Sequence, residues 1–204
     1  LHESEQRERA NSALAETGLP HRRLEAWKWT DFKQVVRAVE ASANPSQSSA
    51  LPSGDHPVIE IAGTQVRVPE NLPAGIKLHT REEAQALGDA EHVPLGAMTA
   101  ALAGRVDTLI IEVTDPTESP LHLVTRGDRD ETNFARVVVI VRPGASLDLI
   151  ESHLGGAGFS SFLIEIGMQE GGQMRRTLLQ QGGRDEAQAV TAIVNLGEAS
   201  EYTQ

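Results

Sequence analysis

Residues 106–204 carry a repeated pattern of short strand-like runs, and this pattern limits the fold more than any other feature of the chain. The runs begin near Asp107, Leu121, Ala135, Leu147, Ser161, Met174 and Gln188. Successive starts lie about 12 to 14 residues apart, a self-similarity typical of stacked solenoids. We therefore expect a parallel β-helix with two strands per turn. A sandwich or a barrel stays an alternative, because regular short strands also occur in those folds.

Apolar and polar residues alternate within several of these runs, as they do in strands with one buried face. Leu147 and Leu149 flank Asp148, and Glu165 interrupts the apolar positions of 162–166. One face should line a narrow core and the other should face water. By the same argument His122, which has apolar neighbours on both sides, is expected at the surface.

The residues that most often support chemistry are sparse or scattered. There are no cysteines, so neither disulfides nor thiolate ligation of a metal or cluster can come from this chain. The seven histidines show no H-x-H or H-E-x-x-H spacing. Ser152 and His153 are adjacent, and neighbours on a strand face opposite ways, so they do not form a nucleophile and base. We predict a protein that is not an enzyme, with no catalytic, cofactor-binding or metal-binding residue.

The chain before the repeats divides into three parts. Residues 1–43 form a helical N-terminal arm: one helix ends at Gly18, and a second is capped by Thr30 and carries an apolar stripe over 32–39. Residues 44–57 are rich in Ser, Pro and Gly and are expected to be a linker. Residues 58–105 are expected to form a small α/β segment that leads into the β-helix core of 106–204.

Within the α/β segment, alternation at 58–61 and 66–68 predicts two strands. The capping box Thr80-Arg81-Glu82-Glu83 predicts a helix that closes at Gly88. A further short helix is expected over 94–104. The predicted fold class is thus mainly β, with a helical N-terminal region, a small α/β segment and a parallel β-solenoid core.

Residues 18–30 form the least generic stretch, with two indoles in a short bend between the two predicted helices. We expect Glu25 to pair with Arg22 or Arg23. Trp27 and Trp29 are expected to anchor the arm through their large buried area. The alternative is that these aromatic residues form a hot spot for a partner protein.

The charge balance argues against two classes of partner. The formal net charge is −11, and residues 106–204 carry seven Lys/Arg against fifteen Asp/Glu. Such acidity repels phosphate backbones, so direct binding to nucleic acid is not expected. The longest apolar runs, near 109–113 and 137–141, are too short to cross a bilayer. The polar first residues do not read as a secretory signal, and we expect a cytoplasmic location.

The bend and the β-rich region together resemble the SufB/SufD family of iron–sulfur cluster assembly proteins. The bend residues that carry this resemblance are Gly18, Pro20, Arg23, Glu25, Trp27, Lys28, Trp29 and Thr30. The runs Ala135–Arg142 and Ala145–His153 follow it. The front end is similar to the SufD branch rather than to the SufB branch. Trp29 is a departure, because the family more often has tyrosine there.

The resemblance implies a non-catalytic scaffold subunit of the SUF complex, a biosynthetic assembly that builds iron–sulfur clusters. It implies pairing with SufB through the β-helix and with the ATPase SufC through C-terminal helices, so that ATP is bound by the partner and this chain holds no cofactor. The family's chains continue through further turns, and we expect that this sequence lacks that C-terminal part. The bend residues are then structural or serve partner docking.

Three other possibilities stay open beside the resemblance. An exposed β-helix edge would also allow self-association. The chain could instead be a free-standing β-solenoid binding module or a β-helix protein that acts on polysaccharides. The aromatic content of 3% argues against the polysaccharide reading.

Overall fold

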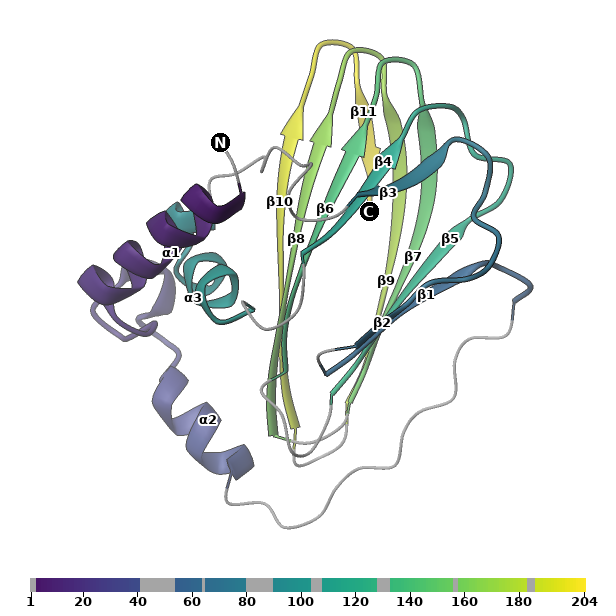
Figure 1. Ribbon diagram of the computed structural model, residues 1–204. Coiled ribbons are helices and arrows are strands. Elements are labelled where there is room, and N and C mark those ends of the chain that lie inside the picture. The colour runs from purple at the N-terminus through teal and green to yellow at the C-terminus, as the bar shows by residue number, and fades with distance from the viewer. Residues whose placement is uncertain are drawn as a thin grey trace.

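The computed structural model is mainly β, with a β-solenoid of about 3 turns preceded by an N-terminal helix (Figure 1). The structure describes residues 3–40, 54–63, 65–79, 90–103, 108–127, 133–155, 158–182 and 186–204. The prediction of a β-solenoid is confirmed. No helix in these ranges is both long and apolar enough to cross a membrane.

Two sheets face each other and form the walls of the solenoid. The first, here called the β5 sheet, has the strand order β11 (Glu201–Thr203), β9 (Gln173–Gln181), β7 (Ser146–Leu154), β5 (Leu121–Arg126), β1 (Val58–Ala62) and β2 (Gln65–Arg67). The second, the β6 sheet, has the order β10 (Glu186–Leu196), β8 (Gly158–Met168), β6 (Asn133–Val141), β4 (Leu109–Val113) and β3 (Ile76–His79). From β4 onward the chain alternates between the sheets, which gives two strands per turn.

The parallel register fixes the length of one turn. Ile111, Val139, Ile166 and Val194 are successive Cα partners on β4, β6, β8 and β10, so they stack at intervals of 28, 27 and 28 residues. One turn is therefore twice the strand spacing seen in the sequence. Among the described strands, two pairs are antiparallel: β2 with β1, and β3 with β4.

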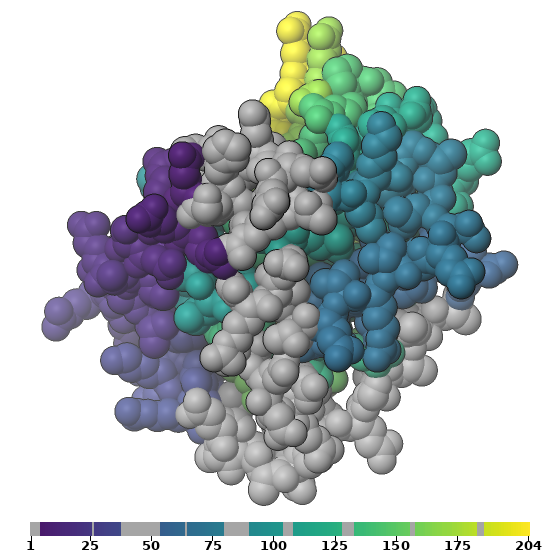
Figure 2. Space-filling view, viewed as in Figure 1, coloured from purple at the N-terminus to yellow at the C-terminus, as the bar shows by residue number. Residues whose placement is uncertain are grey.

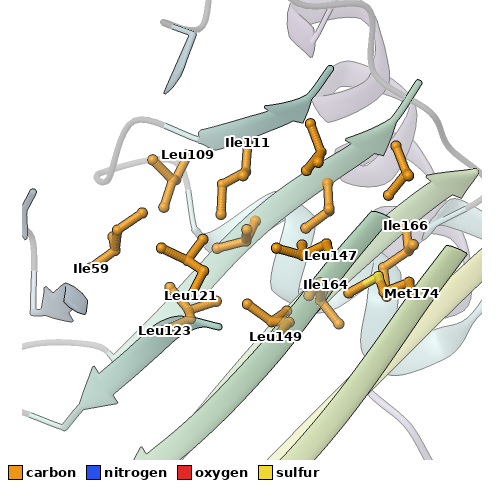
Figure 3. Packing of buried hydrophobic residues seen from close by; sticks show 14 of the residues in the cluster. Ile59, Leu109, Ile111, Leu121, Leu123, Leu147, Leu149, Ile164, Ile166 and Met174 are labelled. Carbon is orange, nitrogen blue, oxygen red and sulfur yellow. The ribbon is translucent and has the colours of Figure 1, made fainter. Parts of the chain in front are cut away.

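The core between the sheets consists of aliphatic side chains that point inward from both walls (Figure 3). Leu147 and Leu149 are buried there, while Asp148, which lies between them, is exposed over 45% of its side chain. This agrees with the alternation predicted from the sequence. Stacked Ile, Leu and Val fit this narrow space because β-branched and aliphatic side chains pack well on pleated surfaces.

Helices cover the outer face of the β6 sheet (Figure 1). They are α1 (Glu3–Thr17), η1 (Glu25–Trp27), α2 (Phe32–Glu40), η2 (Ala90–His92) and α3 (Pro94–Leu102). Ala10 of α1 and Ala100 of α3 pack on Leu163 of β8, and all three are buried. The same cover buries Glu165 completely, so the expectation that Glu165 faces water is wrong.

The helix ends and the short strands agree only partly with the sequence predictions. The C-terminal end of α1 and the start of α3 agree with the sequence. The expectation that Thr30 caps α2 is wrong, because the Oδ1 of Asp31 accepts the Gln34 N–H at 3.2 Å. The short strands β3 and β11 were not expected. Strands β1 and β3, from the predicted α/β segment, belong to the two solenoid sheets. The capping-box helix of 80–88 and most of the predicted linker lie outside the described residues.

Candidate functional site

The bend of residues 18–30 connects α1 to α2 through tight turns. Gly18 ends α1 with a φ of +70°, a conformation that other residues rarely adopt. The N–H of Trp27 donates to the carbonyl of Leu24 at 2.8 Å, and the N–H of Thr30 donates to the carbonyl of Trp27 at 2.9 Å. Pro20 is buried. This part of the motif therefore shapes the backbone.

The charged residues of the bend pair differently from the prediction. Glu25 accepts a hydrogen bond from the Lys28 ammonium at 2.5 Å, and Arg22 lies 3.8 Å from Asp31. The Arg22–Asp31 contact brings the start of the bend beside the start of α2. The expected pair between Glu25 and Arg22 or Arg23 is not the one that forms, since the one-turn η1 places Lys28 directly over Glu25.

The structure separates the two indoles. Trp27 is half-buried and makes an edge-to-face contact with Phe32, with ring centroids 5.9 Å apart. Phe32 in turn contacts Phe159 on β8 at 5.1 Å, so Trp27 connects the bend to the solenoid. Trp29 is 87% exposed, and the Lys28 ammonium lies over its ring, 5.5 Å from the centroid. Trp27 thus contributes packing, whereas the expectation that Trp29 anchors the arm through buried area is wrong.

A second candidate surface is the edge that β10 and β11 form, here called the open edge. β10 pairs with β8 along eleven residues and β11 pairs with β9, and in the described part of the chain no strand pairs with their other sides. Val190 and Val194, which pack on the core, are only partly buried. Leu196 is 58% exposed. The open edge therefore offers backbone donors and acceptors together with apolar surface.

A chain of polar side chains also runs through the interior of the solenoid, along the inner face of the β5 sheet. It consists of Thr125, His153, Glu151, Arg176, Tyr202 and Gln204, and we call it the polar ladder. Arg176 donates to both Glu151 oxygens, at 2.7 and 2.8 Å, and both side chains are almost completely buried. His153 lies within hydrogen-bond distance of Thr125 (2.7 Å) and Glu151 (3.2 Å).

The charges of the polar ladder stabilise one another. Burial by itself would raise the pKa of Glu151, but the hydrogen bonds and charges of His153 and Arg176 outweigh it and lower the pKa. Burial opposes the charge of Arg176 as well, and the hydrogen bonds from Arg176 to Glu151 raise the Arg176 pKa. At its far end Arg176 reaches Gln204 Oε1 at 2.9 Å. The ladder thus ends at the open edge.

The outer face of the β5 sheet holds a histidine that the sequence assigns to the surface. His122 is only 4% exposed, so the expectation of a surface histidine is wrong, although the side chain does point away from Leu121 and Leu123. Its Nε2 lies 2.8 Å from Ser152 Oγ. Burial, followed by the charge of nearby His56, lowers the pKa of His122. Ser152 is completely buried, so the pair is closed to a substrate in this conformation.

Pairing between turns explains what the sequence analysis missed. Ser152 meets His122, 30 residues away, while Glu151 and His153 point inward, as the alternation along a strand requires. Glu151 lies two residues after Leu149 and four after Leu147, so the alternation along the strand predicts that its carboxylate also points inward. Its partner Arg176 could be found only with the register of β7 on β9.

Within the described ranges, no group of three or more His, Cys, Asp or Glu side chains is arranged to hold a metal ion. The fold and its surfaces define a β-solenoid with a helical arm, an aromatic bend and an open edge. No protein-family model matches the sequence, and no curated protein matches it.

Proposed function

We propose that this protein is a scaffold subunit of a SUF-type iron–sulfur cluster assembly complex, with a SufB-like subunit and a SufC-like ATPase as its partners. In this role it contributes shape and docking surface in the cytoplasm, while its partners handle ATP and the nascent cluster. The proposal rests on the resemblance of the bend and of the β-rich region to the SufB/SufD family.

The observation that carries the proposal is the β-solenoid itself, because the resemblance implies pairing with SufB through this fold. A long parallel strand such as β10, which pairs with β8 along eleven residues, can pair with a further strand through its backbone donors and acceptors. The partial burial of Val190 and Val194 adds apolar area that a covering strand would remove from water. A scaffold that assembles through its solenoid needs such an edge.

The bend residues are compatible with two roles in a scaffold. Gly18, Pro20 and Trp27 turn the backbone or pack, whereas Lys28 and Trp29 are exposed. The motif residues therefore include some that stabilise the bend and some that lie at the surface. Lys28 and Trp29, at the surface, are available to a protein partner.

One feature favours the alternative of a free-standing binding module. A groove of about 290 Å³ crosses the turn end of the β5 sheet and is lined mainly by polar groups, among them Asp148, Gln173, Arg175 and Thr203. Hydroxyl, amide and charged groups of this kind suit a sugar. No aromatic side chain is among its described lining residues, so the groove lacks the stacking surface that carbohydrate sites generally use.

Co-purification tests the proposed function. The tagged chain is co-expressed with untagged SufB and SufC, and size-exclusion chromatography with light scattering measures the complex. We expect a complex of defined stoichiometry that Val194→Lys disrupts, since the substitution places a charge in the open edge. Val68→Lys is the matched control, because Val68 is a 46% exposed valine away from that edge.

Two results would contradict the proposal. One is the absence of any complex with SufB. The other is equal disruption by Val194→Lys and Val68→Lys. Saturable binding of a neutral oligosaccharide that Arg175→Ala removes would support the binding module instead.

A further inference from the structure

The bend and α2 carry a positive surface on a strongly acidic protein. Between Gly18 and Arg37 there are five Lys/Arg and two Asp/Glu residues, while the chain as a whole has 18 against 29. Figure 2 shows the arm at the surface on one side of the molecule. A basic region on a protein whose net charge is negative is a candidate site for electrostatic recognition of an acidic partner.

The local geometry leaves several of these cations available. Arg22 and Lys28 are engaged by Asp31 and Glu25. The side chains of Arg23, Lys33 and Arg37 are exposed, and they form no ion pair within the described residues. Lys33 and Arg37 are four residues apart on α2 and therefore share one face of the helix.

Trp29 is the exposed apolar side chain of this basic stretch. Its side chain is 87% exposed, whereas its neighbour Trp27 packs against Phe32. An exposed indole loses little conformational entropy when it is covered and contributes a large contact area, which makes Trp a frequent hot-spot residue. Arg22 and Asp31, which precede and follow Trp29 in the chain, lie 3.8 Å apart.

We propose that Trp29, with Arg23, Lys33 and Arg37, is a docking surface for an acidic protein segment that places one apolar side chain against the indole and carboxylates on the three unpaired cations. This inference goes beyond the proposed scaffold function, because it names the chemistry of the segment that covers Trp29, and its test involves neither SufB nor SufC.

The charge distribution favours a protein segment over two other anionic partners. A nucleic acid needs an extended cationic track, and the remaining surface, with its net negative charge, repels its backbone. A lipid surface needs a broad apolar helix face, but Phe32 of α2 is 5% exposed and already packed against Phe159. A short acidic segment needs only a few local charges and one anchor.

Selection from a random peptide library tests the surface directly, because the library samples acidic, neutral and basic segments alike. Phage-displayed 12-residue peptides are selected on the intact protein and depleted on its Trp29→Ala variant. We expect the enriched peptides to be acidic and to contain one Leu, Phe or Trp. Failure to enrich any acidic peptide after depletion would overturn the proposal.

Fluorescence anisotropy with the best labelled peptide then assigns the contributions. Trp29→Ala should weaken binding about 30-fold, the effect of a hot-spot residue. The double variant Lys33→Glu, Arg37→Glu should weaken it about tenfold or more, and added salt should weaken the binding of the wild type. The controls are Leu196→Ala and Arg175→Glu, an exposed apolar and an exposed basic residue at 58% and 71% exposure, which should leave affinity unchanged.

The same variants test for other occupants of this surface. The chain could instead bind a single-stranded oligonucleotide, bind phosphatidylglycerol vesicles, or self-associate in sedimentation equilibrium. The proposal is overturned if Trp29→Ala abolishes any of these three interactions and acidic peptides do not bind the wild type. Circular dichroism of each variant confirms the fold, since all the substituted side chains are exposed.

Discussion

At the scale of single residues, neighbours in the sequence have opposite roles in the solenoid. Arg176 lies inside and forms a bidentate pair with Glu151, whereas Arg175 points outward and is 71% exposed beside Asp148. The two arginines differ only in the direction of the side chain. A buried charge pair requires both partners, because either charge alone would be left without compensation in the core.

We predict that Glu151→Gln lowers the free energy of unfolding by about 3 to 5 kcal/mol, because it leaves the Arg176 charge unpaired. Chemical denaturation followed by circular dichroism measures this change. Replacing Glu151 and Arg176 together by Met should recover much of the loss. The matched control, Arg175→Met, should cost less than about 1 kcal/mol, as expected for an exposed pair. Equal effects of Glu151→Gln and Arg175→Met would contradict the buried ladder.

The same pair has a defined pH dependence. The folded-state pKa of Glu151 is lowered, so its stabilising contribution is present above the unfolded value of about 4.3 and is lost as pH falls through the lowered folded value. The stability difference between the wild type and Glu151→Gln should therefore be largest near neutral pH and should narrow in acid. Denaturation curves recorded between pH 7 and pH 3 test this expectation. A difference that widened in acid would show that the sign is wrong.

At the scale of elements, α1 is attached to the solenoid by few contacts, and these mix apolar and polar groups. Ala10 is completely buried, and Gln6 donates to Glu165 at 3.2 Å. Arg136 donates to the same carboxylate, yet burial keeps the pKa of Glu165 raised. The pKa of Glu165 is higher in the folded protein than the unfolded value of about 4.3. The attachment of α1 therefore weakens as pH rises from about 4.3 through the folded-state pKa of Glu165. We therefore expect α1 to detach before the strands unfold.

We predict that Ala10→Arg releases α1 while the two sheets stay intact, because a long charged side chain cannot fit between α3 and Leu163. Amide hydrogen exchange read by mass spectrometry should show faster exchange over 3–17 and unchanged exchange in β7 and β8. Ala15→Arg on the exposed side of the same helix is the matched control and should change neither region. Loss of protection in the strands would show that α1 is required for the solenoid itself.

Most elements could be predicted from the sequence, and the exceptions have physical causes. The strands from β4 to β10 follow from alternation and spacing, because one face of each is apolar and turn residues separate them. β3 and β11 are only four and three residues long, too short for alternation to mark them. The cap of α2 was placed one residue early, since Thr30 and Asp31 are both good caps and only the geometry decides between them.

At the scale of the whole molecule, the fold could be predicted but the contacts between turns could not. The regular spacing indicated two strands per turn. The contacts between Glu151 and Arg176, 25 residues apart, and between His122 and Ser152, 30 residues apart, could be found only with the register between turns. The burial of Glu165 and of His122 was also beyond the alternation pattern. That pattern assigns a side chain to one side of a sheet and does not show what covers it.

The bend illustrates the same limit for the candidate site. The sequence marked residues 18–30 as unusual but treated Trp27 and Trp29 together. The structure separates them, because Trp27 meets Phe32 whereas Trp29 extends into solvent at 87% exposure. The open edge was expected as a consequence of the solenoid, and the structure identifies it as one side of β10 and β11.

The central claim is that a sibling subunit docks on the solenoid, next to the strands β10 and β11 of this chain. Hydrogen exchange of the chain with and without SufB tests it most directly. We predict slower exchange of the amides of 186–196 and 201–203 in the complex, with β4 and β5 unchanged. Equal exchange of β10 in the free and the bound protein, with protection confined to another face, would contradict the account.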